Sequence, residues 1–278
     1  MKLMLVRHLW GVDQTSGLSK YGKAWRDFGY EAIEASLGQQ PDPAAFLRFR
    51  ADHHFAWIPQ VFSRDFQPGG TVAEHLRSLR QQVEACLDHQ PLFINAHSGT
   101  DGWSPAEAED FFGQALALEQ RIGIPRAHAT HRLPYSGRPC RTRDLLQKLP
   151  DLKLTCDFSH WVCVCERLLP DLGDIVSLCA QRCLHLHARV GYEEGPQVPD
   201  PAAPEYATHL AAHEAWWDEI WQAQRGRGCP CSTLTPEFGP PPYLHELPYS
   251  RRPAADLPAI CDWMAGRLRT RFQGSGAA

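Results

Sequence analysis

The sequence predicts a single (β/α)8 barrel, a TIM barrel of the α/β class, over residues 1–278. Three observations predict it. Eight short runs have the composition of strands, eight longer segments have the apolar spacing of helices, and the two kinds alternate without a linker between them. A doubly wound open sheet is the alternative. That fold requires a glycine-rich turn after the first strand, which "RHLWGVDQ" at residues 7–14 lacks.

The strands are predicted from short apolar runs bounded by turn residues. The fifth run, "PRAHATHR", alternates side chains between two faces, so Ala129 and His131 share one face and His128, Thr130 and Arg132 share the other. The predicted strands cover residues 3–8, 30–36, 55–62, 91–98, 125–132, 152–160, 183–190 and 232–238.

The helices are predicted from apolar spacing and from capping residues. Thr71 with Glu74 forms the sequence pattern of a capping box. Ser104 followed by Pro105 marks another helix start, and Gly123 marks its end. The predicted helices cover residues 19–28, 41–54, 71–89, 105–122, 140–149, 171–182, 205–225 and 255–272.

Composition narrows the classes of function. The chain has 278 residues, 43% hydrophobic and 22% charged, with a net charge of −4. No apolar run approaches the ~20 residues of a membrane span, and the first ten residues do not resemble a signal peptide. We therefore expect a cytoplasmic protein without a membrane partner. Lysine and arginine form no run, so no nucleic-acid partner is expected.

The cysteines do not indicate a zinc ribbon or a disulfide framework. Cys163 with Cys165 and Cys229 with Cys231 are spaced C-x-C, whereas paired zinc ligands are typically spaced C-x-x-C. We interpret the cysteines as small, mostly buried hydrophobic residues.

Two long proline-rich segments, residues 191–205 and 237–253, follow the seventh and eighth predicted strands. In a barrel, the loops after the strands form the face that carries the chemistry. Long ordered loops at that face are expected to act as lids or as substrate walls.

The carboxyl ends of the predicted strands are unusually polar. Asp157, His187 and Glu237 each follow an apolar run in the sixth, seventh and eighth strands, so three oxygen or nitrogen donors could converge on one ion. Such a mixed set suits Mn²⁺, Zn²⁺ or Co²⁺, and with fewer imidazoles Mg²⁺. The other polar residues at the strand ends are Arg7, His8, His97, His128, His131, Arg132, His160, His185 and Arg189.

These motifs resemble the xylose isomerase-like TIM barrels, a superfamily of sugar and sugar-phosphate isomerases and epimerases, hydroxypyruvate and inosose enzymes, and endonuclease IV-type (AP endonuclease family 2) nucleases. The resemblance spans nearly the whole barrel. It is carried by "DFSHWV" (157–162), "HLHARVG" (185–191) and "TPEFGP" (235–240), with "NAHSG" (95–99) and "THR" (130–132).

The resemblance implies a role for each matching residue. Asp157, His187 and Glu237 would be metal ligands, and Glu237, His160 and His97 would be catalytic. The expected substrate-binding residues are Arg7, His8, Trp10, His131, Arg132 and Arg189.

Ala129 departs from the pattern of the superfamily. A second glutamate ligand is expected immediately before "THR", and Ala129 has no donor atom. Three explanations remain open: a metal site that tolerates the loss, a naturally inactive relative, or a substitution made to trap a complex.

The expected activity is that of a metal-dependent isomerase or epimerase, impaired at Ala129, which acts on a sugar, sugar phosphate or hydroxy-keto acid through enediolate-type proton transfer. The strand-end arginines favour an acidic or phosphorylated substrate, although they could equally pair with loop glutamates. The alternatives are a non-catalytic sugar-binding barrel and an endonuclease IV-like DNA repair nuclease. A homodimer is expected by analogy only.

Overall fold

The computed structural model describes residues 1–64, 67 and 69–275. Within this part of the chain, parallel strands pair in sequence order and the eighth closes on the first, which forms the predicted barrel. The strands are β1 (Lys2–His8), β2 (Tyr30–Ala35), β3 (Ala56–Phe62), β4 (Ile94–His97), β5 (Arg126–Ala129), β6 (Lys153–Cys156), β7 (Cys183–His187) and β8 (Cys231–Thr235).

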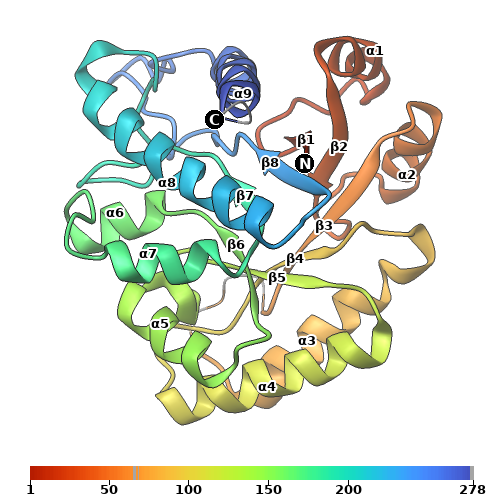
Figure 1. Ribbon diagram of the computed structural model, residues 1–278. Helices are drawn as coiled ribbons and strands as arrows, with labels where there is room; N and C mark the ends of the chain where they lie inside the picture. The colour runs from red at the N-terminus through yellow and green to blue at the C-terminus, as the bar shows by residue number, and fades with distance from the viewer. Residues whose placement is uncertain (65–66, 68, 276–278) are drawn as a thin grey trace.

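The helices surround the barrel, as Figure 1 shows. They are α1 (Ser19–Phe28), α2 (Pro43–Asp52), α3 (Val72–Glu84), α4 (Pro105–Ile122), α5 (Pro139–Lys148), α6 (Ser159–Cys165), α7 (Gly173–Ala180), α8 (Ala207–Gly226) and α9 (Leu257–Gly274). Helix α6 was not predicted, because its first residues were assigned to the end of a strand. No helix in the described ranges is both long enough and apolar enough to cross a membrane.

Local signals explain where several helices begin. Thr71 and Glu74 form a reciprocal capping box at the start of α3, and Ser104 and Glu107 form another at the start of α4. Gly123 ends α4 in the left-handed conformation that glycine adopts without steric cost. All ten cysteines are free thiols, as the sequence predicted, and five of them are buried.

The interior of the barrel changes from apolar to polar along the strands. Val6, Ala32, Ile58 and Phe93 form a separate apolar cluster. Further along β1 and β2, His8 pairs in register with Glu34. The larger apolar core lies between the strands and the helices, where Trp57, Trp161 and Phe112 are fully buried. The two apolar clusters therefore hold the barrel together, and the polar residues gather at the carboxyl ends of its strands.

The two long loops at that end are joined by a side chain. Gln197, after β7, accepts a hydrogen bond from the Gly239 amide (2.7 Å) and donates one to the Gly239 carbonyl (3.1 Å). Gly239 follows β8 and lies against the Trp10 ring. The loops after β1, β7 and β8 therefore support one another.

Candidate functional site

A buried glutamate lies at the centre of the polar interior. Glu34 of β2 is fully buried and accepts hydrogen bonds from Asn95 Nδ2 and Thr235 Oγ1, both at 2.6 Å. Its Oε1 is 2.9 Å from His187 Nε2 on the other side of the barrel. Barrel closure is what brings β2 within reach of β7.

His187 lies between two carboxylates. Its Nε2 faces Glu34, and its Nδ1 is 2.9 Å from Glu237 Oε2. Burial alone would lower the pKa of the imidazole, but the charges of Glu237 and Glu34 outweigh it and hold this pKa well above the ordinary value. Both ring nitrogens of His187 therefore face carboxylate oxygens, an arrangement that favours the imidazolium form.

Asp157 and Glu237 share a buried arginine. Arg189 Nη2 donates to Asp157 Oδ2 and lies 3.2 Å from Glu237 Oε2. Ser159 also donates its backbone amide (3.1 Å) and its hydroxyl to Asp157 Oδ1. Although burial opposes the ionised form of Glu237, His187 and Arg189 hold its pKa well below the ordinary value.

The structure brings the three predicted metal ligands together. One donor atom each from Asp157, His187 and Glu237 lies within 4.8 Å of the others. All three residues are buried. Two carboxylates and one imidazole at this spacing fit a divalent cation, provided that the ligating His187 nitrogen loses its proton.

Glu34, His185 and His187 form a second group of potential ligands. Their atoms already bond one another: His185 Nε2 lies 3.3 Å from Glu34 Oε2. Glu34 and His185 do not line the cavity described below. We therefore interpret Glu34 as the partner that orients His187, an arrangement common behind metal-ligating histidines.

Ala129 faces the interior of the barrel, as alternation along the strand predicts. It pairs in register with Thr155, which pairs with His185, and both of these point inward. His128 points outward and packs edge-on against Phe112 of α4. A glutamate at 129 would therefore extend toward the interior, where the methyl group of Ala129 supplies no donor atom.

Three predicted histidines form a ring cluster beside Arg189. His131 is 3.8 Å from His160 and 5.1 Å from His97, measured between ring centroids. His160 Nε2 accepts from Arg189 Nη2 at 2.6 Å. Burial lowers the pKa of His97 to about 4 and lowers the pKa values of His131 and His160 well below the ordinary range. These imidazoles are therefore neutral at pH 7.

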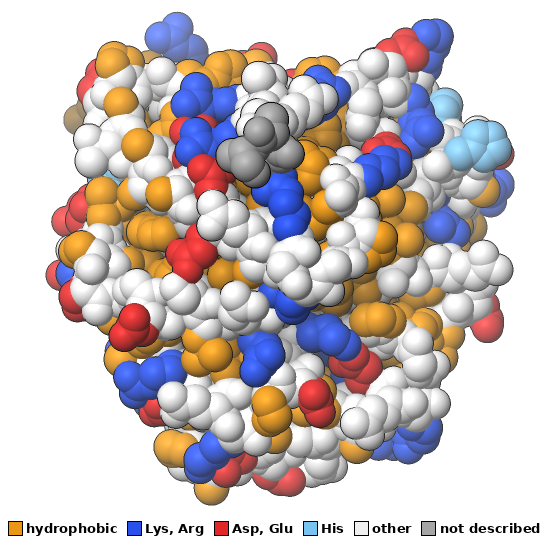
Figure 2. Space-filling model, in the orientation of Figure 1, with side chains coloured by type: hydrophobic (Ala, Val, Ile, Leu, Met, Phe, Trp, Pro, Cys, Tyr) orange, Lys and Arg blue, Asp and Glu red, His pale blue; other side chains and the backbone are white. Residues whose placement is uncertain are grey.

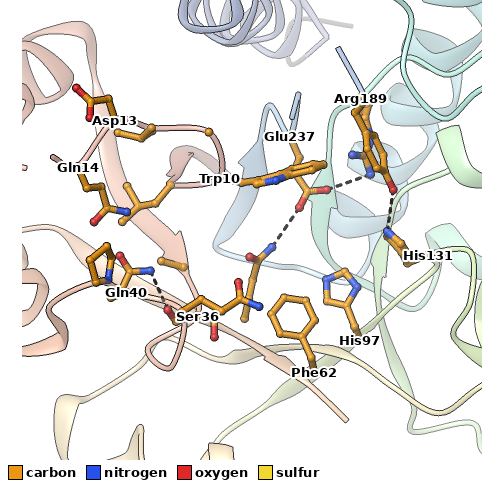
Figure 3. A pocket seen from close by; sticks show the side chains of 18 of the residues that line it. Trp10, Asp13, Gln14, Ser36, Gln40, Phe62, His97, His131, Arg189 and Glu237 are labelled. Carbon is orange, nitrogen blue, oxygen red and sulfur yellow. Dashed lines mark hydrogen bonds and ion pairs between the residues drawn. The ribbon is translucent and has the colours of Figure 1, made fainter. Parts of the chain in front are cut away.

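A cavity of 1020 Å³ opens beside these groups. Glu237, Arg189, His97 and His131 line one part of it, together with Arg132. Figure 3 shows Trp10 projecting beside Glu237, with His131 and His97 to one side and Gln14 and Gln40 to the other. Asp157 and His187 contact the lining residues Arg189 and Glu237 without lining the cavity themselves.

The predicted substrate-binding residues divide into two groups. Trp10, His131, Arg132 and Arg189 line the cavity. Arg7 lies on the helix side of β1, against the rings of Trp25 and Tyr30 and 3.6 Å from Asp262. His8 is buried, with Nε2 3.6 Å from Cys261 Sγ of α9. We therefore do not include Arg7 or His8 among the residues of the candidate substrate site.

Sequence reasoning missed Glu34, Gln60 and Tyr243. Gln60 of β3 donates to Glu237 Oε1 at 3.1 Å. Tyr243 follows β8, with its ring 5.1 Å from the guanidinium carbons of both Arg132 and Arg189. The long loop after β8 could have pointed to Tyr243, and a glutamate within the apolar run "YEAIEAS" could have pointed to Glu34.

Comparisons with known proteins support the architecture. No protein-family model and no curated protein sequence matches the chain. Solved structures match over nearly its full length. A xylose isomerase-like TIM barrel protein from Mycobacterium smegmatis, in complex with magnesium, has a TM-score of 0.64 and 11% identity, and covers 98% of this chain and 97% of its own.

Two further structures are similar. The AP endonuclease, family 2, from Brucella melitensis has a TM-score of 0.60 and 13% identity, with 95% of this chain and 98% of that chain covered. The probable 3-DHS dehydratase AsbF from Bacillus anthracis, involved in petrobactin synthesis, has a TM-score of 0.58 and 15% identity, with 97% and 99% covered. The chain therefore has the fold of the xylose isomerase-like TIM barrels.

Proposed function

We propose that this chain is a divalent-metal-dependent isomerase or epimerase that acts on a sugar, sugar phosphate or hydroxy-keto acid. The observation that supports it most is the convergence of Asp157, His187 and Glu237 within 4.8 Å, next to a 1020 Å³ cavity at the polar end of the barrel. In barrels of this type, that end carries the chemistry.

The proposed roles follow from these contacts. A divalent cation held by Asp157, His187 and Glu237 would polarise the hydroxyl and carbonyl oxygens of the substrate. Glu237 lines the cavity and is the carboxylate placed to move a proton at the adjacent carbon. His97 and His131 line the same part of the cavity and can exchange hydrogen bonds with substrate hydroxyls.

The same geometry supports a weakened activity. Gln60, His187 and Arg189 all hold the carboxylate of Glu237, which makes it a poor proton acceptor. Ala129 supplies neither the expected fourth ligand nor a second acid or base. Losing one positioned acid or base typically costs roughly 10²–10⁴-fold in rate.

Proton transfer and metal binding can be tested separately. Fructose, xylulose and hydroxypyruvate are incubated with the protein in D₂O, with Mn²⁺ or with chelator, and deuterium at the carbon is followed by NMR. Mn²⁺ affinity is measured by calorimetry. We expect slow, Mn²⁺-dependent exchange, and both faster exchange and tighter Mn²⁺ binding in Ala129→Glu. Glu237→Gln is the inactive control. The proposal is contradicted if Ala129→Glu shows no exchange, or if the exchange rate is the same with chelator as with Mn²⁺.

A non-catalytic sugar-binding barrel is the second candidate, favoured by the inward-facing methyl group of Ala129, which supplies no donor atom. It predicts sugar affinity that chelation leaves unchanged and no exchange in either variant. A repair nuclease is not favoured. Such a nuclease needs a metal cluster, whereas in the described ranges the two potential ligand groups share His187. A net charge of −4 gives no excess of positive charge for a DNA backbone. Figure 2 shows acidic and basic side chains interspersed on the opposite face of the barrel, toward the start of β1 and the end of α9.

A further inference from the structure

The cavity has a second wall that the proposed chemistry does not use. The loops after β1 and β2 supply Gln14, Thr15, Ser36, Gln39 and Gln40 to its lining. Figure 3 shows Gln14 and Gln40 on the far side of Trp10 from His131 and Arg189. One part of the cavity is therefore lined by guanidinium, imidazole and carboxylate groups. The other part is lined by neutral amides and hydroxyls together with the apolar residues Leu9, Val12, Ala35 and Pro41.

We call the part of the cavity that contains Gln14, Thr15, Ser36, Gln39 and Gln40 the amide wall. Within it, Gln40 has a hydrogen-bond acceptor without a partner among the described residues. Its Nε2 donates to the Ser36 carbonyl at 2.8 Å, while its Oε1 is buried and has no hydrogen-bond partner among the described residues. A buried acceptor left unpaired is costly. Protein atoms cover this oxygen, so it meets a ligand only when the amide turns toward the cavity. An O–H or N–H donor of a bound molecule would then fit it, whereas a carboxylate or phosphate oxygen could only repel it.

Asp13 does not change the character of this wall. Its carboxylate accepts hydrogen bonds from Thr15 N (2.9 Å) and Thr15 Oγ1 (2.6 Å), and forms an ion pair with Lys20 (3.0 Å). Its charge is therefore balanced within its own loop, and the amides remain the groups offered to a ligand.

The size of the cavity and the position of Trp10 between its two parts point to an extended ligand. A volume of 1020 Å³ lies just above the ~300–1,000 Å³ typical of pockets that hold drug-sized ligands, and a monosaccharide is smaller than such ligands. Trp10 packs edge-on against Tyr243, with ring centroids 4.9 Å apart, and remains 39% exposed. An exposed aromatic face of this kind suits the apolar face of a sugar ring.

We propose that the substrate has two parts: a reacting sugar beside Glu237, and a second neutral, hydroxyl-rich unit against Gln14 and Gln40. The chemical class is a glycoside or disaccharide. The identity of the reacting part rests on the proposed function, whereas the second unit is inferred from the amide wall alone.

Binding in the presence of chelator tests the inference apart from the chemistry. Calorimetry compares glucose and fructose with sucrose, trehalose, maltose and cellobiose, and with glucose 6-phosphate as the charged extension. We expect at least one disaccharide to bind about tenfold or more tightly than either monosaccharide. Gln40→Met should weaken that disaccharide about tenfold and leave the monosaccharides unchanged, as should Gln14→Met.

Gln147→Met, on the exposed surface of α5, is the matched control and should change nothing. Disaccharides that bind no better than monosaccharides, a preference for the phosphate, or equal losses for both sugar classes in Gln40→Met would overturn the inference. Its failure is distinguishable from failure of the proposed function. Metal-dependent exchange on monosaccharides without disaccharide binding defeats the inference alone, and disaccharide binding without exchange defeats the proposed function alone.

Discussion

Arg189 Nη2 lies 3.2 Å from Glu237 Oε2 and also donates to Asp157, so one guanidinium is shared by two of the three proposed metal ligands. Arg189 is fully buried, which makes this pairing strong in the low-dielectric interior. A divalent cation would bind beside a fixed positive charge, and it would do so without the carboxylate that is expected at Ala129.

Removal of this charge should strengthen metal binding. We expect Arg189→Gln to bind Mn²⁺ about tenfold more tightly, because about 1.4 kcal/mol of cation–cation repulsion is relieved. Calorimetry on chelator-treated protein measures the change, and the thermal midpoint checks that the fold survives. Weaker Mn²⁺ binding would show instead that Arg189 holds Asp157 and Glu237 in place for the ion.

Glu34 should act on the metal through His187. Its carboxylate fixes His187 Nε2 at 2.9 Å and leaves Nδ1 facing Glu237. Outer partners of this kind typically contribute ~10–100-fold in metal affinity. We expect Glu34→Gln to weaken Mn²⁺ binding by about this factor. Glu31→Gln, in the same strand but paired with Lys2 at the surface, should leave the affinity unchanged. Equal effects in the two variants would contradict the positioning role.

The fold was predictable because its signals are local. Alternation along strands and spacing along helices need only neighbouring residues. The predicted alternation did not hold beyond Ala129, where β5 ends, because His131 and Arg132 both line the cavity although they were predicted to lie on opposite faces. The prediction was also wrong at residues 157–160. There Asp157 accepts the Ser159 amide and α6 begins, a side-chain bond that apolar patterning does not reveal.

The candidate site was predictable only in part, because its pairings cross the barrel. Glu31 and Glu34 look alike in "YEAIEAS", yet one is at the surface and the other is fully buried against β7. Arg7 looks like Arg189 at a strand end, but its side chain points to the helices. Neither distinction is present in the local sequence, since strand register and barrel closure decide both.

Gly239 should control the position of Trp10. A Cβ at this residue would lie 2.1 Å from Trp10 Cζ3, so Gly239→Ala must move the ring or the loop. We expect loss of sugar binding, measured by calorimetry, with little change in far-ultraviolet circular dichroism. Gly266→Ala, in α9 with no atom near the added carbon, is the control and should retain binding. Unchanged binding in Gly239→Ala would show that Trp10 is not part of the site.

His213 should make the barrel sensitive to acid. Nδ1 donates to the His209 carbonyl (2.8 Å) and Nε2 accepts the Gly191 amide (3.2 Å), so protonation breaks the second bond. Burial lowers its pKa from 6.5 to about 4. The unfolded chain therefore takes up the proton first, and stability is lost as the pH falls from 6.5 toward 4. In urea unfolding, the free energy of unfolding should fall between pH 7 and pH 5 by about 2 kcal/mol less in His213→Gln than in the parent protein. The control is His54→Gln, at an exposed site, whose free energy of unfolding should fall as much as that of the parent. An equal fall in all three proteins would exclude His213 as a source of the acid sensitivity.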